Sequence, residues 1–403
     1  KAFAFCDVLV IGSGPAGLMA ALTAGRSGAD VILAEESHEF GGRLLSDGGT
    51  VGGLPAADWA AGVVAELRAM PNVRLMLRTT ITGAYDHGTY GALERVGLHK
   101  AARPNLPREC FWRIVAPHAV LASGALERPV AFENNDRPGI MMASAVRTYL
   151  NRYGVTPGKR VTLFTNTDAA RAVARDLVAS GVQVAAVIDP RPDAFSVEEF
   201  PVHAGAEVIG SRGRLGLSSV TVRKGAETFE IETDCLAMSG GWNPTIHLTC
   251  HMNGRPRWDA DLAAFVPMEG AVPGLVAVGA ANGSMSTHGA LSSGRAAALQ
   301  AVSALGRKGK ADLPEAEDAP YKLQALWAVP GKGRAWLDFA NDVTVKDVKL
   351  AAQEGYASVE HMKRYTTQGM APDQGKGSSV AALAVLADAT GRTIPETGTT
   401  TFR

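Results

Sequence analysis

A glycine-rich turn between a short strand and a helix constrains this chain more than any other feature of its sequence. Residues 7–36 read DVLVIGSGPAGLMAALTAGRSGADVILAEE, in which an apolar strand, Val8–Ile11, leads into the turn GSGPAG. An Ala- and Leu-rich helix follows, and a second apolar strand, Val31–Ala34, ends at Glu35. A strand, a G-x-G-x-x-G turn, a helix and an acidic residue about 20 positions further on form the full context of a dinucleotide-binding βαβ unit.

Each position of this unit has its own physical role. Gly12 permits the tight turn, Gly14 lets a pyrophosphate approach the backbone, and Gly17 lets the helix pack closely on the strand. The N-terminus of the helix supplies unpaired N–H groups and a partial positive charge for the phosphates. Glu35 can accept both hydrogens of an adenosine ribose diol and would repel a 2′-phosphate, which favours NAD or FAD over NADP. The turn at Gly42-Arg43 can bring backbone groups and a cation near the same phosphates or ribose.

A second strand–helix–strand pattern begins at Lys159, but its glycine positions are occupied by other residues. Thr165, Thr167 and Ala170 stand where the three glycines would be, and side chains at the first two would block a pyrophosphate. Asp168 would add a negative charge where a phosphate would have to sit. We therefore expect a Rossmann-like layer that is retained as scaffold, without a second nucleotide.

The stretches between these units complete the expected architecture. Short β-prone runs from Asn72 to Ala122 indicate a β-meander, after which a strand ends in a turn at Ser123-Gly124 beside the first glycine motif. The run 274–283 (GLVAVGAANG) ends Gly279-Ala280, where flavoproteins of this kind usually have Gly-Asp with the acid binding the flavin ribityl chain. The alanine favours NAD over FAD at this site. A helix is expected to open at 292–298.

Together these features predict an α/β fold of the two-dinucleotide-binding, Rossmann-like class, with a β-meander and a small C-terminal helical module. The expected dinucleotide-binding domain is discontinuous, with residues 1–155 and 256–310, and the degenerate second layer covers 156–255. A polar linker at 311–330 precedes the module, residues 331–403. In that module, Thr344 is an expected N-cap, and helices are expected from there to Glu354, from Ser358 and over 380–389.

Charge and cysteine usage exclude several classes of function. Lys and Arg number 40, as do Asp and Glu, so the chain offers no basic field to nucleic acid or an anionic membrane. The four scattered cysteines exclude a disulfide framework and fit a reducing, cytoplasmic location. The uncharged stretches 8–25 and 270–294 reach membrane-spanning length, but Gly or Pro interrupts both, so no membrane span is expected.

No catalytic residue can be assigned from spacing, and no metal site is expected. His247, Cys250 and His251 fall at helical spacing, but no fourth ligand is suggested, so coincidence is the preferred interpretation. His288 lies in the glycine-rich stretch after the 279–283 turn, where a structural role is favoured over contact with a cofactor.

The chain resembles the α subunits of bacterial heterotetrameric sarcosine oxidases. The matching stretches are 6–21, 123–141 (SGALERPVAFENNDRPGIM), 239–248 (SGGWNPTIHL), 279–283 and, most specifically, 337–376. In related amine-oxidising α subunits the last block carries cysteines that hold a two-iron, two-sulfur centre. This chain has no cysteine in the module, and such a cluster needs thiolates, so the absence favours sarcosine oxidase over the dehydrogenases.

The resemblance implies cofactors and partners beyond what the spacing shows. It implies NAD at the first glycine motif and FMN shared with a β subunit that carries FAD, in a complex with smaller γ and δ subunits. It also implies oxidation of sarcosine to glycine with peroxide formation, while the isolated chain is not expected to be active. The chain is then expected to be an internal piece that lacks a ferredoxin-like N-terminal segment and a C-terminal folate-binding domain.

The resemblance also places Thr80 and Ile81 where their backbone groups would meet the adenine, and Lys363 and Lys376 are candidates near FMN. The full set of expected cofactor-binding residues is Gly12, Gly14, Pro15, Ala16, Gly17, Glu35, Glu36, Gly42, Arg43, Thr80, Ile81, Ser123, Gly124, Gly279 and Ala280. Two alternatives stay open. One is an α subunit of a related amine, opine or hydroxyproline dehydrogenase without its iron–sulfur centre, and the other is a non-catalytic docking scaffold stabilised by NAD.

Overall fold

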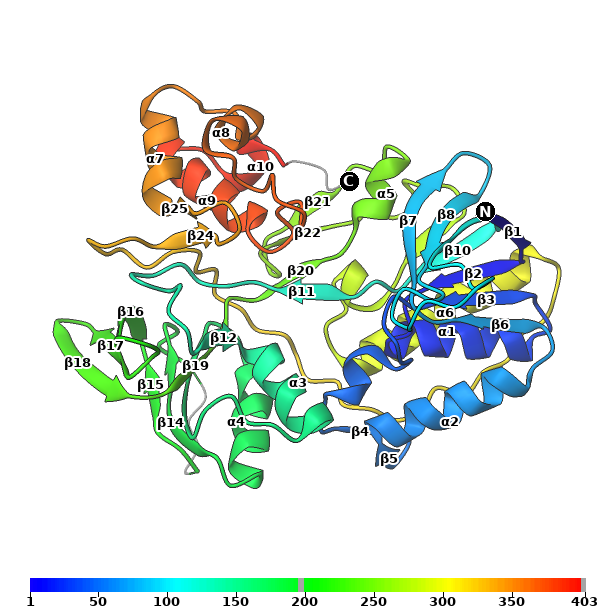
Figure 1. Cartoon of the computed structure of the whole chain (residues 1–403), viewed down its shortest axis with the longest axis horizontal. Coiled ribbons are helices and arrows are strands. Elements are labelled where there is room, and N and C mark those ends of the chain that lie inside the picture. The colour runs from blue at the N-terminus through cyan, green and yellow to red at the C-terminus, as the bar shows by residue number, and fades with distance from the viewer. Residues whose placement is uncertain (195–198, 400–403) are drawn as a thin grey trace.

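Two parallel sheets of short apolar strands carry the fold, with a helical module beside them (Figure 1). The computed structural model describes residues 1–194 and 199–399. The first sheet has the order β23-β10-β2-β3-β6, and all its pairs are parallel. Its strands are β2 (Val8–Ile11), β3 (Val31–Ala34), β6 (Val73–Met76), β10 (His118–Leu121) and β23 (Leu275–Ala277).

Both faces of the first sheet are covered, which explains why its central strands are continuous apolar runs rather than alternating ones. Val8 and Val10 pack into a core with α1 (Pro15–Arg26), α2 (Ala56–Ala69) and α6 (Thr287–Ala304). Leu9 and Ile11 point to the opposite face and pack with the meander. The helix α6 begins at Thr287, five residues before the expected position, because Ser286 caps it by accepting a hydrogen bond from the Gly289 amide.

The meander is a four-stranded sheet of order β1-β9-β8-β7. Its strands are β1 (Ala2–Phe5), β7 (Thr79–Tyr85), β8 (Thr89–Glu94) and β9 (Cys110–Val115). The assignment of Val73–Met76 to the meander was wrong, since this run pairs in parallel with β3 and forms an edge of the first sheet. A four-residue apolar run has the same pattern in either sheet, so the sequence does not separate the two positions.

The second sheet has the order β12-β19-β13-β14-β15, again with all pairs parallel. Its strands are β12 (Ile140–Met142), β13 (Arg160–Thr165), β14 (Gln183–Asp189), β15 (Val202–Ala204) and β19 (Cys235–Ser239), with helices α3 (Ala143–Tyr153) and α4 (Ala170–Ala179). An antiparallel sheet of β16 (Ala206–Arg212), β17 (Ser219–Lys224) and β18 (Glu227–Glu232) is inserted before β19. The expected second βαβ unit is confirmed as β13-α4-β14.

The two layers are joined by a ribbon of β11 (Ala125–Glu127) and β20 (Trp242–Pro244), which are antiparallel (Figure 1). Short elements complete this part of the chain: η1 (Gly42–Leu45), β4 (Thr50–Val51), β5 (Leu54–Pro55), α5 (His247–His251), β21 (Arg257–Asp259), β22 (Ala264–Val266) and η2 (Gly279–Asn282). Residues 306–335 contain no helix, and their β-pairing with both layers is limited to isolated bridges.

The C-terminal module contains β24 (Trp336–Asp338), β25 (Val343–Thr344), α7 (Val345–Gln353), α8 (Val359–Thr366), α9 (Ser379–Thr390) and α10 (Ile394–Thr397). The expected N-cap is confirmed, because Thr344 and Asp347 form a capping box in which each side chain accepts a hydrogen bond from the other residue's amide. The helix starts expected near Ser358 and Val380 are confirmed as α8 and α9. No helix of the described residues is long and apolar enough to cross a membrane.

Candidate dinucleotide site

The three glycines of the first turn have different structural roles. Gly12 has a φ of +94°, and a Cβ there would collide with the carbonyl oxygen of Ala122, the residue after β10. A Cβ at Gly17 would collide with the Gly12 carbonyl oxygen. A Cβ at Gly14 would meet no heavy atom within 4 Å, and Gly14 lines a cavity. Two glycines therefore build the turn, and the third leaves open the space that a ligand backbone or phosphate would need.

Glu35 directly follows β3 and is buried beneath this turn. Its Oε2 accepts hydrogen bonds from the Ser13 amide at 2.9 Å and from the Ser13 hydroxyl at 2.6 Å, and its Oε1 accepts from the Ser37 amide at 2.8 Å. The Ser13 hydroxyl in turn accepts from the Gly41 amide at 3.1 Å. Of about four acceptor positions on a carboxylate, three are taken by the chain itself, which leaves one on Oε1 for a ribose hydroxyl.

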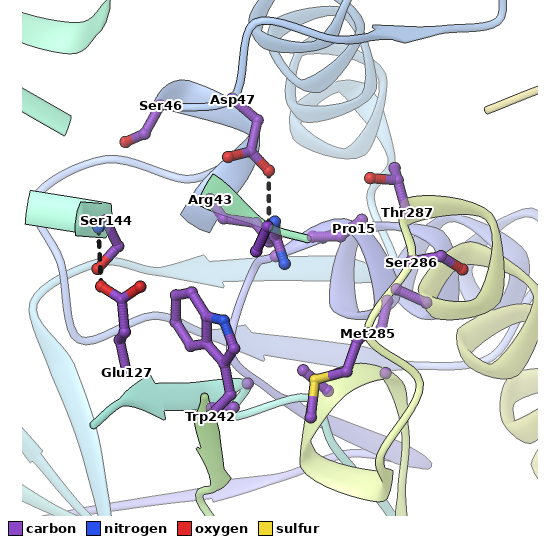
Figure 2. A pocket seen from close by; sticks show the side chains of 18 of the residues that line it. Pro15, Arg43, Ser46, Asp47, Glu127, Ser144, Trp242, Met285, Ser286 and Thr287 are labelled. Atoms are coloured by element: carbon purple, nitrogen blue, oxygen red, sulfur yellow. Dashed lines mark hydrogen bonds and ion pairs between the residues drawn. The ribbon is translucent and has the colours of Figure 1, made fainter. Parts of the chain in front are cut away.

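The turn at Gly41-Gly42 closes over the glycine motif. Gly42 has a φ of +54°, and a Cβ there would lie 2.8 Å from the Gly14 Cα. Arg43 Nε donates to Asp47 at 2.6 Å, and the guanidinium carbon lies 6.0 Å from the centroid of the Trp242 ring. Figure 2 shows the Arg43 side chain above the Trp242 ring, at the side of the cavity near Pro15. A cation and the start of α1 therefore meet where a pyrophosphate would lie.

A cavity opens from this turn into the seam between the two layers (Figure 2). Its volume is about 1140 Å³ including the solvent-open mouth, and it is lined by α1, η1, α3, the β10–β11 turn, β20 and the start of α6. The expected residues that line it are Gly14, Pro15, Ala16, Arg43, Ser123, Gly124, Gly279 and Ala280. These residues come from four separate parts of the sequence, and they fit the pyrophosphate and following groups of a dinucleotide.

The other expected residues lie behind or beside this cavity. Gly12, Gly17, Glu35 and Gly42 do not line the cavity, and they build the turn and its supporting contacts behind it. Glu36 is exposed, and its carbonyl accepts from Arg95 Nη2 at 2.6 Å. Thr80 and Ile81 lie on β7 and pair with β8, where the Ile81 side chain is buried in the core under the meander. The structure therefore brings eight of the fifteen expected residues to one cavity and leaves Thr80 and Ile81 on a neighbouring strand.

Sequence reasoning missed the residues that the second layer contributes. Trp242, Glu127, Ser144 and Arg147 line the cavity from β20, β11 and α3, together with Met285 and Thr287 near the start of α6. Glu127 accepts from the Ser144 amide at 2.7 Å and so caps α3, and burial raises the pKa of its carboxyl. The one available signal was position, since 123–129 follows β10 of the first sheet and 240–244 follows β19 of the second, and ligands of parallel sheets bind beyond the carboxyl ends of the strands.

An ion-pair network ties the cavity wall to the second layer. Arg147 on α3 donates to Asp47 at 2.9 Å and to Asp176 on α4 at 2.6 Å. Asp47 also pairs with Arg43, so one carboxylate connects the glycine-turn side of the cavity to α3. Both partners of the Arg147–Asp47 pair are largely buried, with exposed side-chain fractions of 13% and 16%, so solvent screens this pair less than a surface ion pair.

In the second layer, side chains of the described residues fill the carboxyl ends of β13 and β14. These strand ends correspond to the glycine turn and to Glu35 in the first layer. Thr165 and Thr167 are buried, and Thr165 Oγ1 donates to the Thr167 carbonyl at 3.0 Å. Asp189, which ends β14, is fully buried and paired with Arg191 at 2.6 Å, and Arg191 also pairs with Asp168 at 2.9 Å. The protein itself thus fills the positions where a second pyrophosphate and ribose would lie.

The histidines and cysteine considered for zinc lie together on the short helix α5. The ring centroids of His247 and His251 are 6.1 Å apart. Over the described residues, no three His, Cys, Asp or Glu side chains are arranged to hold a metal ion.

Models of known protein families match both the N-terminal and the C-terminal part of the chain. The family model of FAD dependent oxidoreductases matches residues 7–95, and that of the sarcosine oxidase A3 domain matches residues 332–403. The chain is 47% identical over 417 residues to the sarcosine oxidase α subunit of Rhizobium meliloti (strain 1021), covering 100% of this chain and 41% of that protein. It is 42% identical over 424 residues to that of Corynebacterium sp. (strain P-1), covering 98% and 44%.

The chain thus spans about two fifths of the length of the curated α subunits it matches, and the expected resemblance is confirmed. An opine oxidase subunit of Agrobacterium tumefaciens (strain Ach5) is more distant, 26% identical over 434 residues that cover 92% of this chain and 84% of that protein. Among solved structures, L-proline dehydrogenase from P. horikoshii superposes with a TM-score of 0.78 at 20% identity, over 100% of this chain and 78% of that one. This likeness confirms the Rossmann-like fold class.

Proposed function

We propose, from the premise that this chain is homologous over its whole length to sarcosine oxidase α subunits, that it is the dinucleotide-binding part of such a protein and that its first layer binds NAD. The cavity at Gly14 is the observation that carries this proposal. It combines an open glycine, the N-terminus of α1 and a cation, Arg43, with a buried carboxylate, Glu35, next to the turn.

The far wall of the cavity favours NAD over FAD. Gly279 has a φ of +63°, and a Cβ there would lie 2.9 Å from the Ala16 Cβ, so η2 packs directly against the start of α1. The next residue, Ala280, lines the cavity in place of the acid that flavoproteins of this class use for the ribityl chain. Among the described lining residues the only carboxylates are Asp47 and Glu127, and both already accept hydrogen bonds from the chain.

For the assembled enzyme we propose the oxidative demethylation of sarcosine. The amine is oxidised to an imine while oxygen accepts the two electrons and becomes hydrogen peroxide, and hydrolysis of the imine releases glycine and the former methyl carbon as formaldehyde. The chemistry would take place on the FAD that a β subunit carries and on FMN at the interface with this chain, in a complex that also contains γ and δ subunits. The named relatives are subunits, which supports a multi-subunit assembly. In this proposal the chain supplies the nucleotide-stabilised scaffold, and none of its residues is given a catalytic role.

A second candidate is the α subunit of an opine- or amine-oxidising enzyme, supported by the similarity to the opine oxidase subunit. The higher identity to sarcosine oxidase subunits favours the first candidate. Oxygen consumption by the complex reconstituted with its β subunit, with sarcosine compared with opines, distinguishes the two. A docking scaffold without turnover predicts no oxygen consumption with either substrate.

The nucleotide itself is tested by denaturing the purified protein and identifying what it releases by chromatography and mass. We expect NAD and no FAD. Gly14→Ala should fold normally, because its Cβ meets no protein atom, but should release less than about a tenth of the wild-type nucleotide, because the methyl group enters the phosphate space. Gly62→Ala, on the exposed face of α2 where a Cβ also meets nothing, is the matched control and should keep its nucleotide. Released FAD, or full nucleotide content in Gly14→Ala, would contradict the proposal.

A further inference from the structure

Ser13, between the first two glycines of the turn, has a hydroxyl that both donates and accepts a hydrogen bond. It is fully buried, and both its amide and its hydroxyl donate to the same carboxylate oxygen, Glu35 Oε2, at 2.9 and 2.6 Å. The hydroxyl also accepts from the Gly41 amide at 3.1 Å. A small hydroxyl residue thus connects the glycine turn, the end of β3 and the Gly41-Gly42 turn.

These hydrogen bonds determine which oxygen of Glu35 can still accept a hydrogen bond from a ligand. Oε2 has its two lone pairs occupied by the two Ser13 donors, and Oε1 has one occupied by the Ser37 amide. A carboxylate held by three donors cannot turn to offer both oxygens to a ligand. The sequence-based expectation that Glu35 accepts both ribose hydroxyls is therefore narrowed to one acceptor position, on Oε1.

We infer that Ser13 is a positioning residue for nucleotide specificity, an inference that rests on the proposed dinucleotide site. Its hydroxyl holds Glu35 so that Oε1 accepts one ribose hydroxyl and the fixed negative charge excludes a 2′-phosphate. The same hydroxyl accepts a hydrogen bond from the Gly41 amide and so holds the Gly41-Gly42 turn against the glycine motif. The approach there is close, since a Cβ built on Gly42 would lie 2.8 Å from the Gly14 Cα. One side chain thus sets both the ribose-binding oxygen and one wall of the phosphate space.

Alanine at position 13 removes one of the two donors to Oε2 and the acceptor of the Gly41 amide, but keeps the residue-13 amide. A hydrogen bond to a charged group is worth on the order of tenfold in a binding constant. For Ser13→Ala we expect NAD to bind about tenfold more weakly, since Glu35 is less fixed. The affinity for NADP should change less, so the preference for NAD over NADP should become smaller.

The test is a double-mutant cycle in the full chain freed of nucleotide, with dissociation constants for NAD and NADP measured by calorimetry. The variants are Ser13→Ala, Glu35→Gln and the two combined. If Ser13 acts through the Glu35 carboxylate, Ser13→Ala should cost less than about threefold when Glu35 is already replaced. Ser27→Ala is the matched control, because the Ser27 hydroxyl donates to the Thr23 carbonyl at the C-terminal end of α1, away from the site, and its affinities should stay within about twofold of wild type.

Equal weakening of NAD and NADP in Ser13→Ala, or the same cost in both backgrounds, would overturn the positioning role and leave the proposed function standing. If the wild-type chain carries FAD instead, the NAD assignment fails. The same cycle, measured as FAD dissociation, then decides the role of Ser13, because the adenosine ribose is common to both nucleotides. A wild-type chain that binds neither dinucleotide would overturn both statements.

Discussion

At the scale of single residues, Arg128 shows how this fold holds a charge without an acidic partner among the described residues. The guanidinium is buried, with 1% of the residue exposed, and burial lowers the pKa of Arg128 to about 10. Its hydrogen bonds go to the Gly240 carbonyl at 2.6 Å, the Asn243 amide oxygen at 2.9 Å and the Ala263 carbonyl at 2.8 Å. Its guanidinium carbon lies 4.6 Å from the centroid of the Trp327 ring. Oxygen dipoles and an aromatic face thus replace a counter-ion.

Because these oxygens are buried around the guanidinium, we expect Arg128→Met to lower the free energy of unfolding by about 3–5 kcal/mol. Methionine keeps much of the side-chain length but removes the donor that the three buried oxygens share. The measurement is urea unfolding of the full chain. Arg212→Met is the control, since Arg212 is 67% exposed and pairs with Glu230 at the surface, and it should change stability by less than about 1 kcal/mol. A cost for Arg128→Met as small as that of the control would contradict this account.

At the scale of elements, residues 321–329 form an extended segment, here termed the strap, that crosses the strand ends of the second sheet. Leu323 forms a β-bridge with Thr167, and the Gln324 amide donates to the Asn166 carbonyl at 3.2 Å. Asn166 Nδ2 donates back to the Gln324 carbonyl at 2.7 Å, and Arg191 Nη1 donates to the Lys322 carbonyl at 3.3 Å. These contacts lie at the β13–α4 loop, where a second dinucleotide would place its pyrophosphate.

Because the strap covers this loop, we expect one dinucleotide per chain, and no binding of NADPH to the second layer. Calorimetry with NAD and NADPH, together with native mass spectrometry, measures the stoichiometry. Hydrogen exchange gives an independent check, since the backbone amides of the strap should remain protected at saturating NADPH. Asn166→Ala should lower the free energy of unfolding by about 1–2 kcal/mol without creating a site. Two nucleotides per chain, or exposure of the strap on adding NADPH, would show that the second site opens.

Elements whose pattern is set locally were predicted well from the sequence. The βαβ unit at residues 7–36 and the capped helix after Thr344 depend on glycine turns, apolar runs and capping residues close in sequence. The failure at Val73–Met76 concerned which sheet a short strand joins, and long-range packing decides that. Trp242 and Glu127 were missed as lining residues for the same reason, since the β11–β20 ribbon brings them to the cavity. The strap has no periodic sequence pattern, so it could not be predicted. Its position is defined by contacts with residues far away in the sequence.

At the scale of the whole molecule, the C-terminal module and the first layer influence each other through α5. His247 on α5 is largely buried, and its pKa is lowered to about 4, first by burial and then by the positive charge of Lys376 and by His251. Lys376 lies in the module, between α8 and α9. A neutral imidazole is thus held on α5, within reach of the positive charge that Lys376 contributes from the module.

The pKa of His247 makes the stability of this arrangement depend on pH. The unfolded chain holds the proton with a pKa near 6.5, so it binds protons more tightly than the folded chain, and stability falls as the pH drops from 6.5 towards 4. We expect this group to account for a loss of up to about 3 kcal/mol over that range. In His247→Gln the unfolding free energy should no longer show this decrease between pH 6.5 and pH 4. In Lys376→Met the decrease should be smaller, because the positive charge that repels the protonated imidazole is gone. Urea unfolding between about pH 7 and pH 4.5 measures these differences, with His87→Asn in the exposed β7–β8 turn as the control. Equal pH dependence in wild type and His247→Gln would show that this histidine does not make the folded molecule sensitive to acid.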